Sequence, residues 1–174
     1  MAAGDFCALE EAVNMFREMR RKRQQLPEAE AVAVLERGSS GVLAVLGDGG
    51  YPYAVPLSYV YSDGKLYFHC AKSGHKLDAV RECDKASFCV VARDDVVPEE
   101  FTTRYVSVIA FGRVREITGD DEKLAAVRLL AEKYAPELGE AAREAAIERD
   151  LAPLCMLELN VEHLTGKQAR ELLK

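Results

Sequence analysis

The sequence contains no run of about 18 apolar residues, the length that a membrane-spanning helix requires. Residues 1–16 carry Asp5, Glu10 and Glu11 where a signal peptide needs a basic segment followed by an uninterrupted apolar one. Basic residues are also in deficit, with 23 Lys and Arg against 29 Asp and Glu and a net charge of −6. Nucleic-acid binding depends mainly on a basic surface that neutralises phosphates. We therefore expect a cytoplasmic protein whose partners include neither a membrane nor a nucleic acid.

Cysteine and histidine are both scarce. The five cysteines are odd in number, widely spaced and without a CxxC pair, which indicates reduced core thiols rather than a disulfide framework or a zinc site. The three histidines lack the spacing of HExxH or a similar motif, so no metal site is expected. The cysteines are Cys7, Cys70, Cys83, Cys89 and Cys155, and the histidines are His69, His75 and His163.

Several catalytic and nucleotide-binding motifs are also missing. Ser58 and Ser73 lack the GxSxG context of a hydrolase nucleophile. Neither GxGxxG nor GxxxxGK[ST] occurs, which argues against a Rossmann or a Walker site. The sequence identifies no catalytic residue. An enzyme with this sequence would therefore take its chemistry from a cofactor.

What is present is typical of one globular domain. Hydrophobic residues make up 49% and charged residues 30% of a 174-residue chain, which is long enough for a sizeable core. Hairpin signals occur at 48–50 (DGG) and 62–64 (SDG), and Gly112 marks a bulge or a close backbone approach. The polar stretch 93–103, which contains Pro98, is predicted to be a loop. Strands are predicted at 42–46, 51–61, 65–71, 85–92, 104–117 and 153–161. Helices are predicted at 8–24, from Pro27 to near Gly38, at 73–82, at 120–134, at 136–149 and in the tail after Gly166.

This element order predicts an α+β protein built on a six-stranded antiparallel split β-barrel with flanking helices. Pro52 and Pro56 prevent full pairing of the strand at 51–61, so closure of the barrel could be incomplete there.

The strand at 104–117 is substantially apolar on both faces, because Val106, Val108 and Ala110 alternate with Tyr105, Ser107, Ile109 and Phe111. Such a strand needs cover on both sides, which favours a homodimer.

The stretch 65–76 (KLYFHCAKSGHK) indicates an anion site. Its first half alternates as a strand, and Ser73 is predicted to be the N-cap of the helix that follows. His75 and Lys76 then occupy the first turn, where the helix dipole favours negative charge. A bound phosphate would explain why two side chains that can carry a positive charge occupy this turn. The alternative is that Lys76 points to solvent at a cost of a few tenths of a kcal/mol, and this stretch alone does not choose between them.

Four segments together resemble a known superfamily: PYAVPLSYVY (52–61), DGKLYFHCAKSGHKLDAV (63–80), RYVSVIAFGRV (104–114) and HLTGKQA (163–169). They are similar to the FMN-binding split β-barrel superfamily, in the pyridoxamine 5′-phosphate oxidase-related branch that includes the nitroimidazole-resistance (Nim) flavoproteins. The resemblance covers about residues 19–116 and the C-terminal strand. We expect one FMN-binding domain over residues 1–174, with a helical extension at 1–18 and a helical insertion at 120–149.

The resemblance also implies a homodimer with FMN in grooves between the subunits. Val55, Pro56, Leu57 and Ser58 would line the isoalloxazine ring. His69, Cys70 and Ala71 would run beside the ribityl chain, although Cys70 replaces the small hydroxyl residue expected there. His75 and Lys76 would hold the phosphate, in agreement with the helix-start argument. Tyr105, Ser107 and Val108 would approach from the partner subunit, and Lys167 would reach the site from the tail.

The function implied is that of an FMN-dependent oxidoreductase, which takes a hydride from a reduced nicotinamide and reduces a small organic acceptor such as a nitroaromatic compound. The alternative is a non-catalytic protein that binds a flavin, pyridoxal phosphate or haem. The sequence does not identify the donor, the substrate or the pocket that would hold it.

Overall fold

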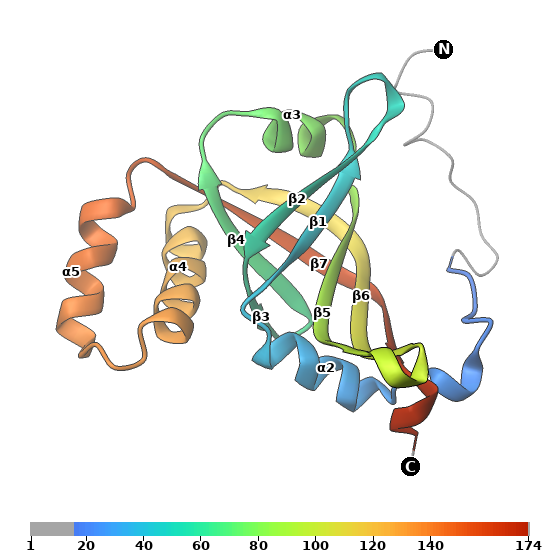
Figure 1. Ribbon diagram of the computed structural model, residues 1–174. Coiled ribbons are helices and arrows are strands. Elements are labelled where there is room, and N and C mark those ends of the chain that lie inside the picture. Colours follow the sequence, from blue (N-terminus) through green and yellow to red (C-terminus); the bar gives the residue numbers. More distant parts are fainter. Residues whose placement is uncertain (1–15, 174) are drawn as a thin grey trace.

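The computed structural model describes residues 16–173 and shows an α+β fold, in which one antiparallel sheet is covered by four helices (Figure 1). The helices are α2 (Glu28–Arg37), α3 (His75–Glu82), α4 (Asp120–Tyr134) and α5 (Glu140–Asp150). The strands are β1 (Ser40–Leu46), β2 (Pro52–Ser58), β3 (Val60–Ser62), β4 (Lys65–Ala71), β5 (Lys85–Val97), β6 (Thr102–Ile117) and β7 (Leu154–Gln168). Within the described residues no helix is long and apolar enough to cross a membrane.

The sheet has seven strands in the order β2-β1-β5-β6-β7-β4-β3, and every ladder is antiparallel. The prediction of six strands was therefore wrong by one, and the sheet is not closed. The extra strand arises at Tyr59, where the predicted strand 51–61 divides into β2 and β3. Tyr59 is fully buried, its hydroxyl donates to the Leu35 carbonyl at 2.8 Å, and its N–H donates to the Tyr134 hydroxyl at 3.0 Å. These contacts hold Tyr59 out of the ladder and separate the two strands.

The predicted loop at 93–103 was also wrong. β5 continues to Val97 and β6 begins at Thr102, so only a short 3₁₀ turn, Pro98–Glu100, and Phe101 separate the two strands. The register pairs of this ribbon continue to Val97↔Thr102. Most side chains of the segment are exposed, so the sequence lacks the apolar–polar alternation that marks a strand with one buried face. The strands are held instead by their backbone hydrogen bonds.

The N-terminal segment differs from the predicted helix at 8–24. Residues 8–15 lie outside the described part of the chain, and residues 16–24 contain only a 3₁₀ turn, Lys22–Gln24. Gln24 is buried and its amide donates to the Gln168 carbonyl at 3.1 Å, while Gln25 forms an isolated bridge with Lys167. Pairing with the end of β7 thus takes the place of helical hydrogen bonds.

Two apolar clusters organise the molecule. The larger fills the interior of the sheet and includes Leu35, Phe68 and Phe88, with α2 and α3 contributing from the two ends (Figure 1). The smaller joins α4 and α5 to the outer face of the sheet, through residues such as Ile147 and Met156. The insertion 120–149 is therefore packed onto β3, β4 and β7 instead of standing apart.

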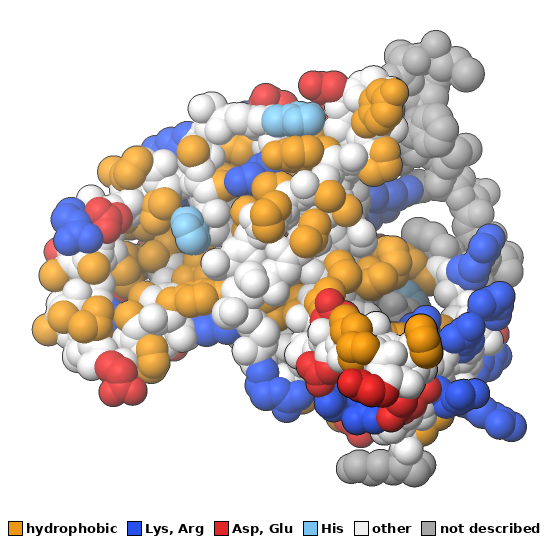
Figure 2. Space-filling model, viewed as in Figure 1, with side chains coloured by type: hydrophobic (Ala, Val, Ile, Leu, Met, Phe, Trp, Pro, Cys, Tyr) orange, Lys and Arg blue, Asp and Glu red, His pale blue; other side chains and the backbone are white. Residues whose placement is uncertain are grey.

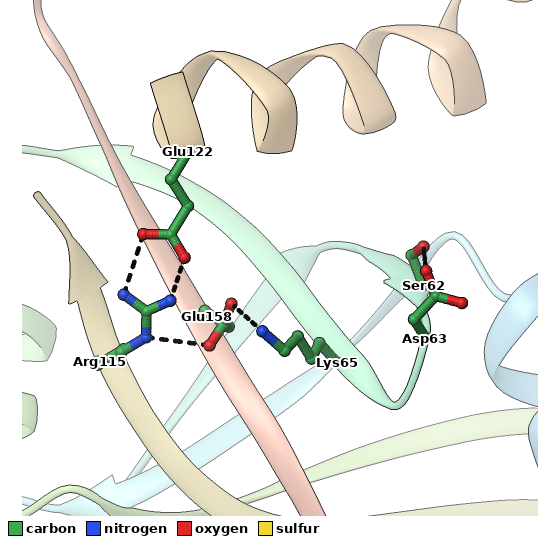
Figure 3. Close-up of polar contacts among 6 residues, drawn as sticks. All are labelled: Ser62, Asp63, Lys65, Arg115, Glu122 and Glu158. Carbon is green, nitrogen blue, oxygen red and sulfur yellow. Dashed lines mark hydrogen bonds and ion pairs between the residues drawn. The ribbon is translucent and has the colours of Figure 1, made fainter. Parts of the chain in front are cut away.

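A buried carboxylate links three of these elements (Figure 3). Glu158 on β7 is 3% exposed, yet it accepts hydrogen bonds from Lys65 on β4 and Arg115 on β6, each at 3.0 Å. Arg115 also pairs with Glu122 of α4, and the hydrogen bonds to Glu122 and Glu158 raise the pKa of its guanidinium. The Glu158 carboxylate therefore ties α4 to the sheet through Arg115.

Gly112 lies at a register shift between β6 and β7, as its sequence context predicted. A Cβ atom at this position would clash with the Asn160 carbonyl oxygen, a contact that the backbone must move to relieve. We expect Gly112→Ala to lower the free energy of unfolding by about 1–3 kcal/mol, the usual cost of overpacking. The control is Gly139→Ala, where a Cβ meets nothing within 4 Å. Urea unfolding would test this, and equal losses for both variants would contradict the steric argument.

Candidate functional site

The start of α3 departs from the sequence prediction by one residue. Gly74, not Ser73, is the N-cap, with φ of 127° and ψ of 165° and no side-chain capping hydrogen bond. Such a φ favours glycine, which explains why the serine does not occupy the capping position. The Gly74 carbonyl accepts from the N–H groups of Leu77 and Asp78. His75 and Lys76 thus open the helix, and their own backbone N–H groups have no acceptor within it.

His75 and Lys76 have different surroundings. The His75 ring stacks on Tyr53 of β2, with centroids 4.1 Å apart, and its Nε2 lies 3.7 Å from Asp48 Oδ2. Lys76 is half-buried and lies near the end of β4. Burial raises the pKa of the Cys70 thiol, and the Lys76 ammonium offsets part of that increase. The Lys76 ammonium is therefore close enough to Cys70 on β4 to influence its thiol.

β2 and β4 alternate between exposed and covered positions beside α3. Pro56 and Ser58 are exposed on β2, and Val55 and Leu57 are half-buried. On β4, His69 and Ala71 are exposed, whereas Cys70 points into the core beside its register partner Cys155. β2 and β4 contact each other, so these residues and the start of α3 form one continuous region. This region, Val55–Ser58 with His69–Ala71, His75 and Lys76, is called the α3 groove below, after the flavin groove that the family resemblance implies here.

The remaining predicted site residues lie elsewhere in the chain. Ser107 and Lys167 are register partners on β6 and β7, and the Lys167 ammonium is 5.3 Å from the centroid of the Tyr105 ring. Val108 is fully buried in the core. β7 pairs with β4 only through residues 154–160, so Lys167 is at the opposite end of this strand from the α3 groove. One chain therefore does not bring the two sets together.

Tyr105 also lines a cleft of about 980 Å³ with a basic wall. Figure 2 shows Lys and Arg side chains gathered at the end of the molecule where the chain terminates. Of the basic residues here, Lys22 pairs with Glu18 at 2.7 Å and Arg170 lies 3.9 Å from Glu171. The basic side chains of the cleft are Arg20, Arg21, Lys22, Arg23 and Arg170.

Sequence reasoning missed a cavity of about 470 Å³ between the helical insertion and the sheet. Ser58 and His69 of the α3 groove form part of its wall, and α4 and α5 supply most of the rest. No local signal could have revealed it, because its two walls are separated by about half of the chain and meet only through packing.

The α3 groove fits a phosphate-bearing cofactor. It combines the ammonium of half-buried Lys76, a histidine and the backbone N–H groups of His75 and Lys76, and these are donors that a phosphate prefers. Within residues 16–173 there is no group of three or more His, Cys, Asp or Glu side chains that could hold a metal ion. The donor set therefore suits an organic phosphate.

Comparisons with solved structures show the same fold. A candidate 5-nitroimidazole antibiotic resistance protein from Bacteroides thetaiotaomicron is 18% identical, with a TM-score of 0.71 over 83% of this chain and 86% of its own. An FAD-binding protein from Mesorhizobium loti is 25% identical, with a TM-score of 0.56 over 83% and 96%. An FAD- and haem-binding protein from Mycobacterium smegmatis is 23% identical, with a TM-score of 0.70 over 84% and 74%. No curated protein matches the chain.

The fold and these similarities define a protein of the FMN-binding split β-barrel superfamily, as the sequence resemblance implied. A family model described as pyridoxamine 5′-phosphate oxidase matches residues 27–168, well over half of the chain. The chain belongs to the pyridoxamine 5′-phosphate oxidase family.

Proposed function

We propose that the protein is an FMN-dependent oxidoreductase that uses a reduced nicotinamide to reduce a small organic acceptor. The observation that carries this proposal is the start of α3, where Lys76 and His75 follow a glycine N-cap beside the edge strand β2. A single phosphate site of this kind suits a mononucleotide, and the sequence has no dinucleotide fingerprint. The FAD-binding proteins of the same fold make FAD the direct alternative.

Bound FMN would accept a hydride and pass electrons on, which no side chain of this protein can do. The protein's own part is to hold and orient the cofactor. Lys76 and the first-turn N–H groups would bind the phosphate, and the backbone of Val55–Ser58 would meet the polar edge of the ring. Because β2 is an edge strand that ladders only with β1, its other side has backbone groups available for such contacts.

We further propose that the working unit is a homodimer. Tyr105, Ser107 and Lys167 lie at the far end of β6 and β7 and cannot reach the α3 groove of their own chain. A second copy would supply them to this groove. Val42 and Val91 are exposed apolar side chains on β1 and β5, 38% and 61% accessible, which such an interface would cover.

Free thiols at Cys70, Cys89 and Cys155 suit a reducing compartment such as the cytoplasm.

The purified protein offers a direct test. We expect denaturation to release FMN, identified by chromatography, and we expect anaerobic mixing with NADH or NADPH to remove the absorbance of the oxidised flavin. A nitroaromatic acceptor should then restore it. FAD in the released fraction would contradict the cofactor assignment. A flavin that stays oxidised with both nicotinamides would instead identify a flavin-binding protein without this activity.

A further inference from the structure

The cavity beside the α3 groove has a firmly held outer wall. The Tyr134 hydroxyl donates to the Tyr59 carbonyl at 2.8 Å and accepts from the Tyr59 N–H at 3.0 Å, which fixes the end of α4 to the β2–β3 junction. Arg128 of α4 and Glu144 of α5 form a two-point ion pair, with contacts of 2.8 Å and 2.7 Å. Ile147 packs α5 into the smaller core cluster. The space between the helices and the sheet is therefore preformed.

The helical side of the lining is mainly apolar, although Tyr134, Arg143 and Asp150 also belong to it, and Ser58 and His69 make the sheet side polar. Leu130 and Ala131 of α4 face Ala146 and Ile147 of α5, and Ser58 and His69 contribute from β2 and β4. Figure 2 shows hydrophobic side chains along the recess between the projecting helical pair and the sheet. A volume of about 470 Å³ lies within the usual range of small-molecule sites.

Most polar groups of the lining already have partners. The Tyr134 hydroxyl is occupied by the Tyr59 backbone, and Arg143 donates to the carbonyls of Ala135 and Leu138 in the α4–α5 turn. Asp150 pairs with Arg149 at 2.6 Å. In contrast, neither the Ser58 hydroxyl nor the His69 ring has a hydrogen bond or ion pair within residues 16–173. The polar side chains left for a ligand are thus on the sheet side.

We propose that this cavity binds the electron acceptor, as a neutral, mainly apolar aromatic molecule whose polar substituent meets Ser58 and His69. The proposal rests on the proposed function, because Ser58 and His69 also belong to the groove expected to hold the flavin. An apolar wall favours burial of an aromatic ring. An ionised ligand would lose its hydration there, and the charged side chains of the lining are already engaged, Arg143 by the carbonyls of the α4–α5 turn and Asp150 by Arg149. The insertion 120–149 then determines acceptor specificity, since α4 and α5 supply the apolar wall.

Isothermal titration of the purified holoprotein with 4-nitrotoluene and with 4-nitrobenzoate tests the class of ligand. We expect the neutral compound to bind at least about tenfold more tightly than its anionic analogue. Equal affinity, tighter binding of 4-nitrobenzoate, or no binding of 4-nitrotoluene would overturn the proposal.

Three alanine-to-leucine variants test the location. Ala131→Leu and Ala146→Leu fill the cavity from α4 and from α5, and Ala141→Leu adds the same bulk to an exposed position of α5 outside it. We expect about tenfold weaker binding of 4-nitrotoluene in the two filling variants and none of this loss in the control. In steady-state reduction the filling variants should raise KM far more than they lower kcat. Unchanged binding in both filling variants, at parental thermal stability, would place the ligand elsewhere.

The same titrations separate this inference from the proposed function. FMN affinity should be the same in the parent and in all three variants, because none of the substitutions touches the α3 groove. If the parent protein binds no flavin, the proposed function is refuted. Titration of that protein with 4-nitrotoluene would still decide whether the cavity is a ligand-binding site. A parent that binds and reduces flavin but shows the same 4-nitrotoluene affinity in every variant would overturn only the cavity proposal.

Discussion

Replacing Lys76 by alanine is expected to weaken FMN binding by about ten- to hundredfold. Half-buried Lys76 stands in the first turn of α3, where a dianionic phosphate would meet both its ammonium and the helix N–H groups. Loss of such a charge-assisted contact corresponds to roughly 1.5–3 kcal/mol. Isothermal titration of the apoprotein with FMN measures the change.

Riboflavin provides the ligand control for this variant, because it lacks the phosphate. It should bind the parent and Lys76→Ala almost equally. Lys72→Ala is the matched protein control, since Lys72 is an exposed lysine just before the same helix. Stability without cofactor should change little or increase slightly, because a cation leaves the positive end of the helix dipole. Similar losses for FMN and riboflavin would show that Lys76 acts through folding and not through the phosphate.

Glu158→Gln is expected to cause the largest loss of stability. Glu158 is 3% exposed and accepts from Lys65 and Arg115, both at 3.0 Å. Removing one partner of a buried ion pair generally costs about 3–5 kcal/mol, because the remaining charge loses its compensation. Lys65 and Arg115 each retain partial exposure, so we expect a loss near the lower end of that range. Urea unfolding measures this loss of unfolding free energy, and the slope of that free energy against urea concentration is compared between variants.

The matched control is Glu144→Gln, which removes a carboxylate from the two-point pair with Arg128 on the surface of α4 and α5. Solvent screens this pair, so a much smaller loss is expected. Equal losses in the two variants would mean that burial adds nothing to the Glu158 interactions. A changed slope for Glu158→Gln would indicate that α4 has separated from the sheet.

Local signals account for the parts of the fold that the sequence predicted well. The turns at 48–50 and 62–64 depend on residues that tolerate positive φ, and the structure places Gly49, Gly50, Asp63 and Gly64 there. The helices at 120–134 and 136–149 were recognised from periodicity, and α4 and α5 occupy nearly the same residues. These features are decided by neighbours in the chain.

The same reasoning failed where a distant contact outweighed the local preference. Tyr59 lies in a run with strand character, but Leu35 and Tyr134 hold it out of the sheet. Residues 93–97 are polar and exposed, yet they pair with β6. Gln24 belongs to a segment with a helical pattern, but only the 3₁₀ turn Lys22–Gln24 forms there, and the Gln24 amide donates to the Gln168 carbonyl at the end of β7.

The sequence by itself determined the α+β class, the family resemblance and the stretch 65–76 as the centre of the candidate site, because alternation, turn residues and basic residues at a helix start are written within a few positions of one another. Only the tertiary structure decided that the sheet stays open, that Gly74 caps α3, and that one chain separates Lys167 from Lys76. It also decided that α4 and α5 enclose a cavity with His69. These features depend on which surfaces pack together across the chain, and packing is a property of the whole fold that no short stretch encodes.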